Sequence, residues 1–276
     1  MKKVMLIAVL LLVLGVANAY ATPVTFNIDE LYDWGRLYSY SAGVYTPINT
    51  NPAPYGTNPV PGYTIAENTS GVADGAEDSW GIGNIASIKT FPGNATIFER
   101  GASEMTLMFF GFDDNFISQP IGASSILHAV GGRIQVYLDA TPDFDGSLGT
   151  AGRTGLSTYS NVTDGLLVLD LVPVLTAEGA TLTSFSNLAT GSGAGSMLLG
   201  VSGAGAWDAY FDTNTQLYGS DFSLTFTARD NTQGTTIGDW IVRGDAGGES
   251  DVIPEPASMV LLGIGLFGAA RFRRKA

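Results

Sequence analysis

The sequence predicts an all-β fold, an antiparallel β-sandwich or jelly-roll-like body over residues 22–251, placed between two targeting segments. Three observations predict this fold class. Apolar and polar residues alternate with a period of two in several stretches, pairs of Gly, Asn or Asp interrupt these stretches at short intervals, and the body holds no sustained helical period. Because such alternation makes one face of each strand apolar, two sheets packed face to face are the expected arrangement.

The strand patterns differ in clarity along the body. Residues 222–228 alternate cleanly, with Phe222, Leu224 and Phe226 on one face, and weaker patterns predict strands at 84–91, 134–138, 180–185 and within 189–206. Nearly continuous apolar runs predict strands covered on both faces at 105–112 and 166–175. Pro173 lacks an N–H, which predicts a strand end or an edge there. Four pairs are interpreted as turns between strands: Gly131-Gly132, Asp164-Gly165, Asp230-Asn231 and Gly247-Gly248.

Residues 1–21 have the pattern of a secretion signal peptide. Lys2 and Lys3 precede an apolar run at 4–17 that is too short to cross a bilayer comfortably. Ala19 and Ala21 each end a small-x-small cleavage pattern, so the mature chain is expected to begin at Tyr20 or Thr22. The alternative interpretation is an uncleaved membrane anchor.

The body is strongly acidic and contains no cysteine. Residues 22–253 carry 25 acidic side chains against seven basic ones. This charge excludes nucleic acid as an expected partner, because phosphates are repelled, and it remains compatible with divalent cations, basic proteins or neutral sugars. The charge can also serve solubility alone. Without cysteine, disulfides and thiolate metal sites are excluded.

The C-terminal segment, residues 252–276, has three parts in a fixed order. Pro254-Glu255-Pro256 comes first, an apolar stretch at 257–270 follows, and a basic end closes the chain with Arg271, Arg273, Arg274 and Lys275. This order resembles the PEP-CTERM protein-sorting tail. Fourteen helical residues reach about 21 Å against roughly 30 Å of hydrocarbon, so the tail is expected to form a single, marginal membrane helix with its basic end in the cytoplasm.

The resemblance implies an exosortase as processing partner, with cleavage near Pro254-Glu255-Pro256. It further implies a Gram-negative bacterium that makes exopolysaccharide. The protein is then held briefly in the inner membrane by its tail and afterwards joins the cell surface or the extracellular matrix. The alternative is an ordinary C-terminal membrane anchor, which has the same short span and basic end.

Calcium is the one cofactor that the sequence leaves open. Asp139, Asp143 and Asp145 lie in one acidic stretch that matches only half of a calcium-binding loop, and Asp113 with Asp114 forms a second cluster. Asp and Asn also favour turns through their own backbone hydrogen bonds, which explains both clusters without a metal.

Catalytic groups are scarce in the sequence. His128 is the only histidine, and no nucleophile motif accompanies it. The sequence therefore predicts a non-enzymatic surface or matrix protein, associated with biofilm or exopolysaccharide. The alternatives are a calcium- or glycan-binding lectin-like module and, third, a secreted hydrolase built on paired carboxylates.

Overall fold

The computed structural model describes residues 21–35, 38–41, 44–47, 77–117, 124–177, 182–187, 192–231 and 236–253. Nearly all of its regular structure in these ranges is β. The strands are β1 (Thr22–Gly35), β2 (Tyr38–Ser41), β3 (Val44–Pro47), β4 (Ser79–Thr90), β5 (Thr96–Glu99), β6 (Glu104–Ile117), β7 (Ser124–Asp139), β8 (Leu166–Val174), β9 (Leu182–Asn187), β10 (Ser192–Val201), β11 (Phe222–Asp230) and β12 (Val242–Val252). The short helices are the 3-10 helices η1 (Gly146–Gly152) and η2 (Leu217–Gly219), and the α-helix α2 (Asp208–Phe211).

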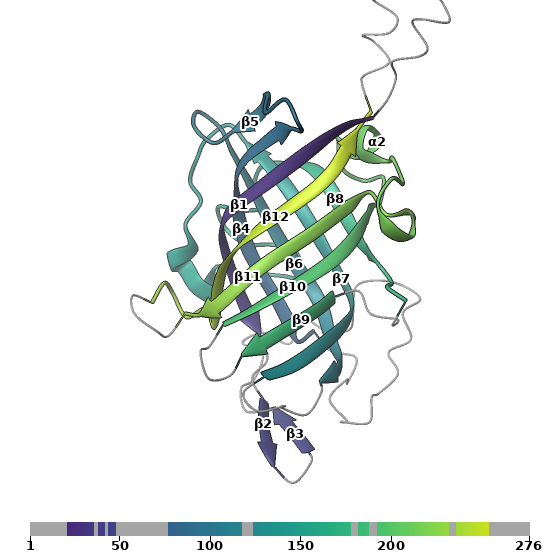
Figure 1. The fold of residues 1–276 in the computed structure, drawn as a ribbon. Helices are drawn as coiled ribbons and strands as arrows, with labels where there is room; N and C mark the ends of the chain where they lie inside the picture. The colour runs from purple at the N-terminus through teal and green to yellow at the C-terminus, as the bar shows by residue number, and fades with distance from the viewer. Residues whose placement is uncertain are drawn as a thin grey trace, which may run out of the picture.

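The main sheet closes on itself into an antiparallel barrel of eight strands, as Figure 1 shows. Neighbours around the barrel follow chain order in the sequence β1, β4, β6, β7, β8, β10, β11, β12, and β12 pairs with β1 to close the ring. β9 continues the position of β8, since both strands pair with β7 and with β10 at different heights. The β2–β3 ribbon is a separate two-stranded sheet.

The prediction of a sandwich or jelly roll is therefore wrong. Local alternation makes one face of a strand apolar, whether that face meets a second sheet or the inside of a barrel. What distinguishes the two folds here is the long seam between β1 and β12, which joins the two ends of the body from Thr22 opposite Val252 to Asp33 opposite Val242.

Most predicted strands are confirmed, and two predicted turns are not. The patterns at 84–91, 105–112, 134–138, 166–175, 180–185, 189–206 and 222–228 overlap β4, β6, β7, β8, β9, β10 and β11. Pro173 is the penultimate residue of β8, as expected of a strand end. Gly131-Gly132, however, lies inside β7 and Gly247-Gly248 inside β12, so these glycines belong to strands.

Side chains divide between the inside of the barrel and a second cluster on its outer wall. In β1, Phe26 and Ile28 belong to the inner core, whereas Tyr32 and Trp34 belong to the outer cluster. The inner core collects apolar residues from every strand position around the barrel. Both faces of β1, β4 and β6 are consequently buried along part of their length.

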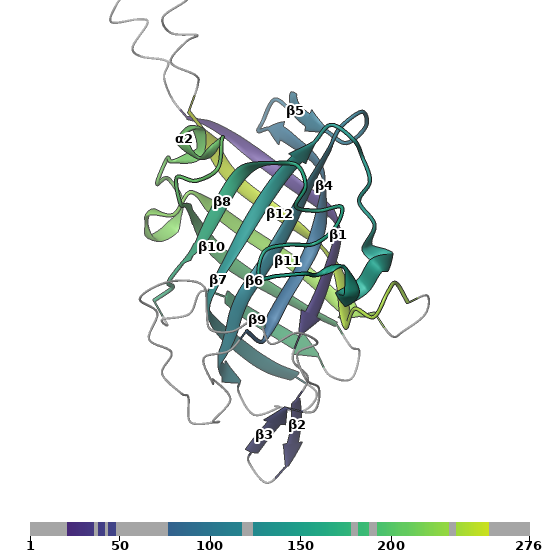
Figure 2. The same ribbon diagram turned by 180° about the vertical axis from the view of Figure 1, so that it is seen from behind.

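The outer cluster is covered by the segment between β7 and β8, which lies over the outer faces of β1, β4 and β6 on the side of the barrel seen in Figure 2. Trp240, from the loop before β12, is its centre: the indole Nε1 donates a hydrogen bond to the Gly146 carbonyl at 2.8 Å. The Trp240 ring stands edge-on to Trp80, with centroids 5.2 Å apart, and stacks near Tyr32 at 6.0 Å. The connection is thus fixed to the barrel wall by aromatic packing and buried hydrogen bonds.

Candidate functional site

The two ends of the barrel domain lie side by side. Thr22 pairs with Val252 across the seam, so the first strand begins where the last strand ends. The amide of Ile253 then donates to the Tyr210 carbonyl at 2.8 Å, which ties the end of β12 to the α2 region. Ile253, the last described residue, is thus hydrogen-bonded to the fold, and Pro254 of the sorting motif follows it in the sequence.

The predicted targeting residues flank this point. Ala21 is described and partly buried just before β1, whereas Ala19 lies outside the described residues. The sorting residues Pro254, Glu255 and Pro256 and the basic residues Arg271, Arg273, Arg274 and Lys275 also lie outside them. No helix within the described ranges is both long enough and apolar enough for a membrane span, and the predicted membrane helix falls in the part that is not described.

Three carboxylates meet at the same end of the barrel. Glu104 begins β6 and Asp139 ends β7, and these two residues are paired across the strands. Asp143 follows in the loop, and one carboxylate oxygen from each of the three lies within 4.8 Å of the others. Glu104 is buried, Asp139 is half-buried and Asp143 is exposed. Such a set of oxygens at a loop matches the ligand chemistry of a hard cation.

The electrostatics of this acidic cluster are unfavourable for three negative charges. Burial raises the pKa of the Glu104 carboxyl, and the charges of Asp143 and Asp139 raise it further, against hydrogen bonds from the amides of Asp143 and Phe144. The pKa of Asp143 is also raised, by desolvation first and then by Asp164 and Asp139. A bound divalent cation would remove this repulsion.

The other predicted calcium ligands serve other purposes or lie elsewhere. Asp145 caps η1 by accepting the Ser147 amide at 2.8 Å. Hydrogen bonds from the Ser147 side chain and then from its amide lower the pKa of Asp145. Asp113 is buried within β6 opposite Val130, and Asp114 follows in the same strand. Of the five predicted residues, the cluster thus contains Asp139 and Asp143, together with Glu104, which sequence reasoning missed.

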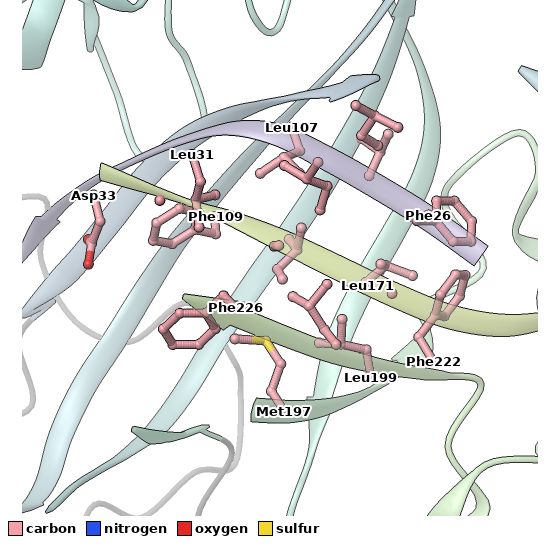
Figure 3. A pocket seen from close by; sticks show the side chains of 18 of the residues that line it. Phe26, Leu31, Asp33, Leu107, Phe109, Leu171, Met197, Leu199, Phe222 and Phe226 are labelled. Atoms are coloured by element: carbon pink, nitrogen blue, oxygen red, sulfur yellow. The ribbon is translucent and has the colours of Figure 1, made fainter. Parts of the chain in front are cut away.

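A cavity of about 100 Å³ lies inside the barrel, shown in Figure 3. Its wall is apolar and is drawn from strands all around the ring. The labelled lining includes Phe26, Leu31, Leu107, Phe109, Leu171, Met197, Leu199, Phe222 and Phe226. A space of this size is several times what one water needs, and its apolar wall offers water few partners.

Asp33 lies at one end of this cavity (Figure 3). The Ser79 hydroxyl donates to Asp33 Oδ1 at 2.9 Å. Burial raises the pKa of Asp33 to about 7, and the Ser79 hydrogen bond opposes that rise. Arg243 also borders the cavity, but it is paired with Tyr32, whose ring packs on the outer wall, so strand alternation directs the arginine side chain outward.

The comparisons identify the C-terminal tail. Residues 252–275 match the family model of the PEP-CTERM protein-sorting motif. The chain is therefore an exported protein that an exosortase sorts, and its tail is anchored in the membrane before processing. No curated protein and no solved structure matches the chain.

Proposed function

We propose that the protein is a non-enzymatic component of the cell surface or extracellular matrix, associated with exopolysaccharide and biofilm. The observation that carries this proposal is the point in the sequence at which the barrel ends. The seam between β1 and β12 ends at Thr22 opposite Val252, two residues before Pro254. Cleavage near Pro254-Glu255-Pro256 thus lies outside the hydrogen-bonded ring.

Because the last strand ends before this motif, cleavage there removes no strand of the barrel. Every strand of the described ring precedes Pro254, and the Ile253 N–H donates the last described backbone hydrogen bond to the fold. An enzyme at the membrane surface would release a complete barrel to the outside. A closed barrel has no free sheet edge in its ring, which suits a protein that persists outside the cell without pairing to other strands.

The composition supports a non-catalytic role and contact with an uncharged polysaccharide. The chain has a single histidine and no cysteine, and its body carries 25 acidic residues against seven basic ones. An acidic surface repels polyanions and tolerates neutral polysaccharide. We therefore favour exopolysaccharide over nucleic acid as the matrix component that the protein meets.

The test is a pair of variants in an exosortase-positive host. Glu255→Ala is expected to leave the protein full-length and in the membrane fraction. Glu249→Ala, on the exposed face of β12, is the matched control and should be processed normally. If western blots show the same size and location for Glu255→Ala as for wild type, the proposed processing at this motif is contradicted. A deletion strain with normal aggregation and attachment would defeat the matrix role.

A second candidate function is a calcium-dependent, lectin-like module. The convergence of Glu104, Asp139 and Asp143 favours it, because extracellular calcium modules use carboxylates from loops at millimolar affinity. Glycan arrays with calcium and with EDTA separate the two functions. Calcium-dependent binding to a defined glycan supports the module, and an unchanged array pattern counts against it.

A further inference from the structure

The middle of the inner face of β12 carries only small residues. Three successive inward positions hold Gly244, Ala246 and Gly248, opposite larger residues such as Phe26 and Ile28 on β1. A Cβ built on Gly248 would meet nothing closer than 3.5 Å, at Leu224 and Phe26. A methyl group would therefore fit at Gly248 in ordinary van der Waals contact, and Gly248 lines the cavity.

The cavity is polar at one end only. Asp33 is the charged side chain that the strand alternation directs inward, and Ser79 occupies one of its oxygens with a single hydrogen bond. An ionised carboxylate can accept about four hydrogen bonds, so Asp33 has capacity for a further donor. Around it, the wall is formed by side chains such as Leu31 and Phe109.

We propose that the barrel interior binds one small aliphatic amine, with the alkyl chain in the apolar cavity and the ammonium group on Asp33. Apolar pockets with one well-placed polar group are typical small-molecule sites, and eight-stranded barrels are wide enough to hold one small ligand. An ammonium group can donate three hydrogen bonds and carries the charge opposite to Asp33. A carboxylate in the same place would be repelled in a medium of low dielectric constant. This proposal does not depend on the matrix role.

Three probes of equal chain length, short enough for a cavity of about 100 Å³, test the proposal: butylamine, 1-butanol and butanoate. Titration calorimetry on the processed protein at pH 8, where Asp33 is largely ionised, is expected to show binding of one butylamine per barrel. Butanol should bind at least about tenfold more weakly, and butanoate more weakly still. Absence of butylamine binding, or equal affinity for butanoate, overturns the proposal.

Two sets of variants locate the site. Asp33→Asn should reduce butylamine affinity to that of butanol and leave butanol affinity unchanged. Gly248→Leu fills the cavity from the inward position of β12 and should abolish binding of both probes. Gly247→Leu, at the neighbouring outward position, is the matched control and should bind butylamine as wild type does. Retained binding in a folded Gly248→Leu protein would show that the amine binds elsewhere, whether or not Asp33→Asn folds.

Discussion

The guanidinium of Arg153 and the carboxylate of Glu77 form a two-pronged salt bridge inside the protein, with nitrogen–oxygen distances of 2.5 and 2.9 Å. Their side chains are 0% and 1% exposed. The guanidinium carbon also lies 4.3 Å from the Trp80 ring centroid, and Glu77 accepts the Gly111 amide at 2.6 Å. This pair joins the covering segment between β7 and β8 to the residues directly before β4.

Replacing Glu77 by Gln should lower the free energy of unfolding by about 3–5 kcal/mol. The substitution leaves a buried arginine charge without its counter-ion, and breaking one side of a buried pair is strongly destabilising. Urea unfolding followed by tryptophan fluorescence measures the change. Asp29→Asn is the control, because the Arg100–Asp29 pair is 36% and 37% exposed, and surface pairs contribute about 0–1 kcal/mol. Equal effects of the two variants would contradict the larger contribution of the buried Arg153–Glu77 pair.

The stability of the barrel should depend on pH through Asp33. Its pKa is raised from 3.8 to about 7 in the folded protein, so the folded state binds the proton more tightly than the unfolded state. The stabilisation is complete below pH 4 and is lost as the pH rises to about 7. Asp33→Asn should remove this loss, and it should therefore be more stable than wild type by about 1–3 kcal/mol at pH 8, after allowance for partial exposure.

Chemical denaturation of both proteins at pH 5 and pH 8 checks this prediction. The difference between wild type and Asp33→Asn isolates the one carboxyl from the other titrating groups. Ser79→Ala removes the hydrogen bond that favours the ionised form, so it should raise the pKa of Asp33 further and enlarge the loss of stability between pH 5 and pH 8. A constant difference between wild type and Asp33→Asn across this pH range would contradict the assignment.

Local alternation predicted most of the strands but not the closure of the ring. β12 was not recognised from its sequence, because three successive inward positions in its middle hold Gly244, Ala246 and Gly248 in place of large apolar residues. Its Gly247-Gly248 pair resembles a turn for the same reason. A strand without an apolar stripe can still complete a sheet when the backbone hydrogen bonds of both neighbours, β1 and β11, are available to it.

The candidate calcium site was predictable only where its residues are close in sequence. Asp139 and Asp143 lie in one loop and were recognised together, whereas Glu104 becomes their neighbour only through the pairing of β6 with β7. Sequence spacing gives no distance between residues on different strands. Asp145 shows the opposite error, because its spacing fits a ligand loop while its side chain caps η1.

Calcium should raise the melting temperature through the acidic cluster. At ten times its dissociation constant, the ion would stabilise the folded state by about 1.4 kcal/mol. Glu104→Gln or Asp139→Asn should abolish this response in scanning calorimetry, whereas Asp145→Asn should retain it, because Asn also caps a helix well. No calcium-dependent shift in the wild-type protein, compared with EDTA, would retire the calcium module.

The covering segment between β7 and β8 should detach from the barrel wall more readily when Trp240 is replaced by a smaller residue. Trp240→Phe removes the hydrogen bond to the Gly146 carbonyl and leaves a void beside Trp80 and Tyr32. The expected cost is about 2–4 kcal/mol, from an unpaired buried carbonyl and lost ring contacts. Limited proteolysis should then cut between residues 140 and 165 faster than in wild type. Leu217→Ala, at a side chain that is 72% exposed, should change neither stability beyond about 0.5 kcal/mol nor the cleavage rate. An unchanged cleavage rate for Trp240→Phe would contradict this role of the indole and leave the attachment to the other contacts of the segment, such as the Arg153–Glu77 pair.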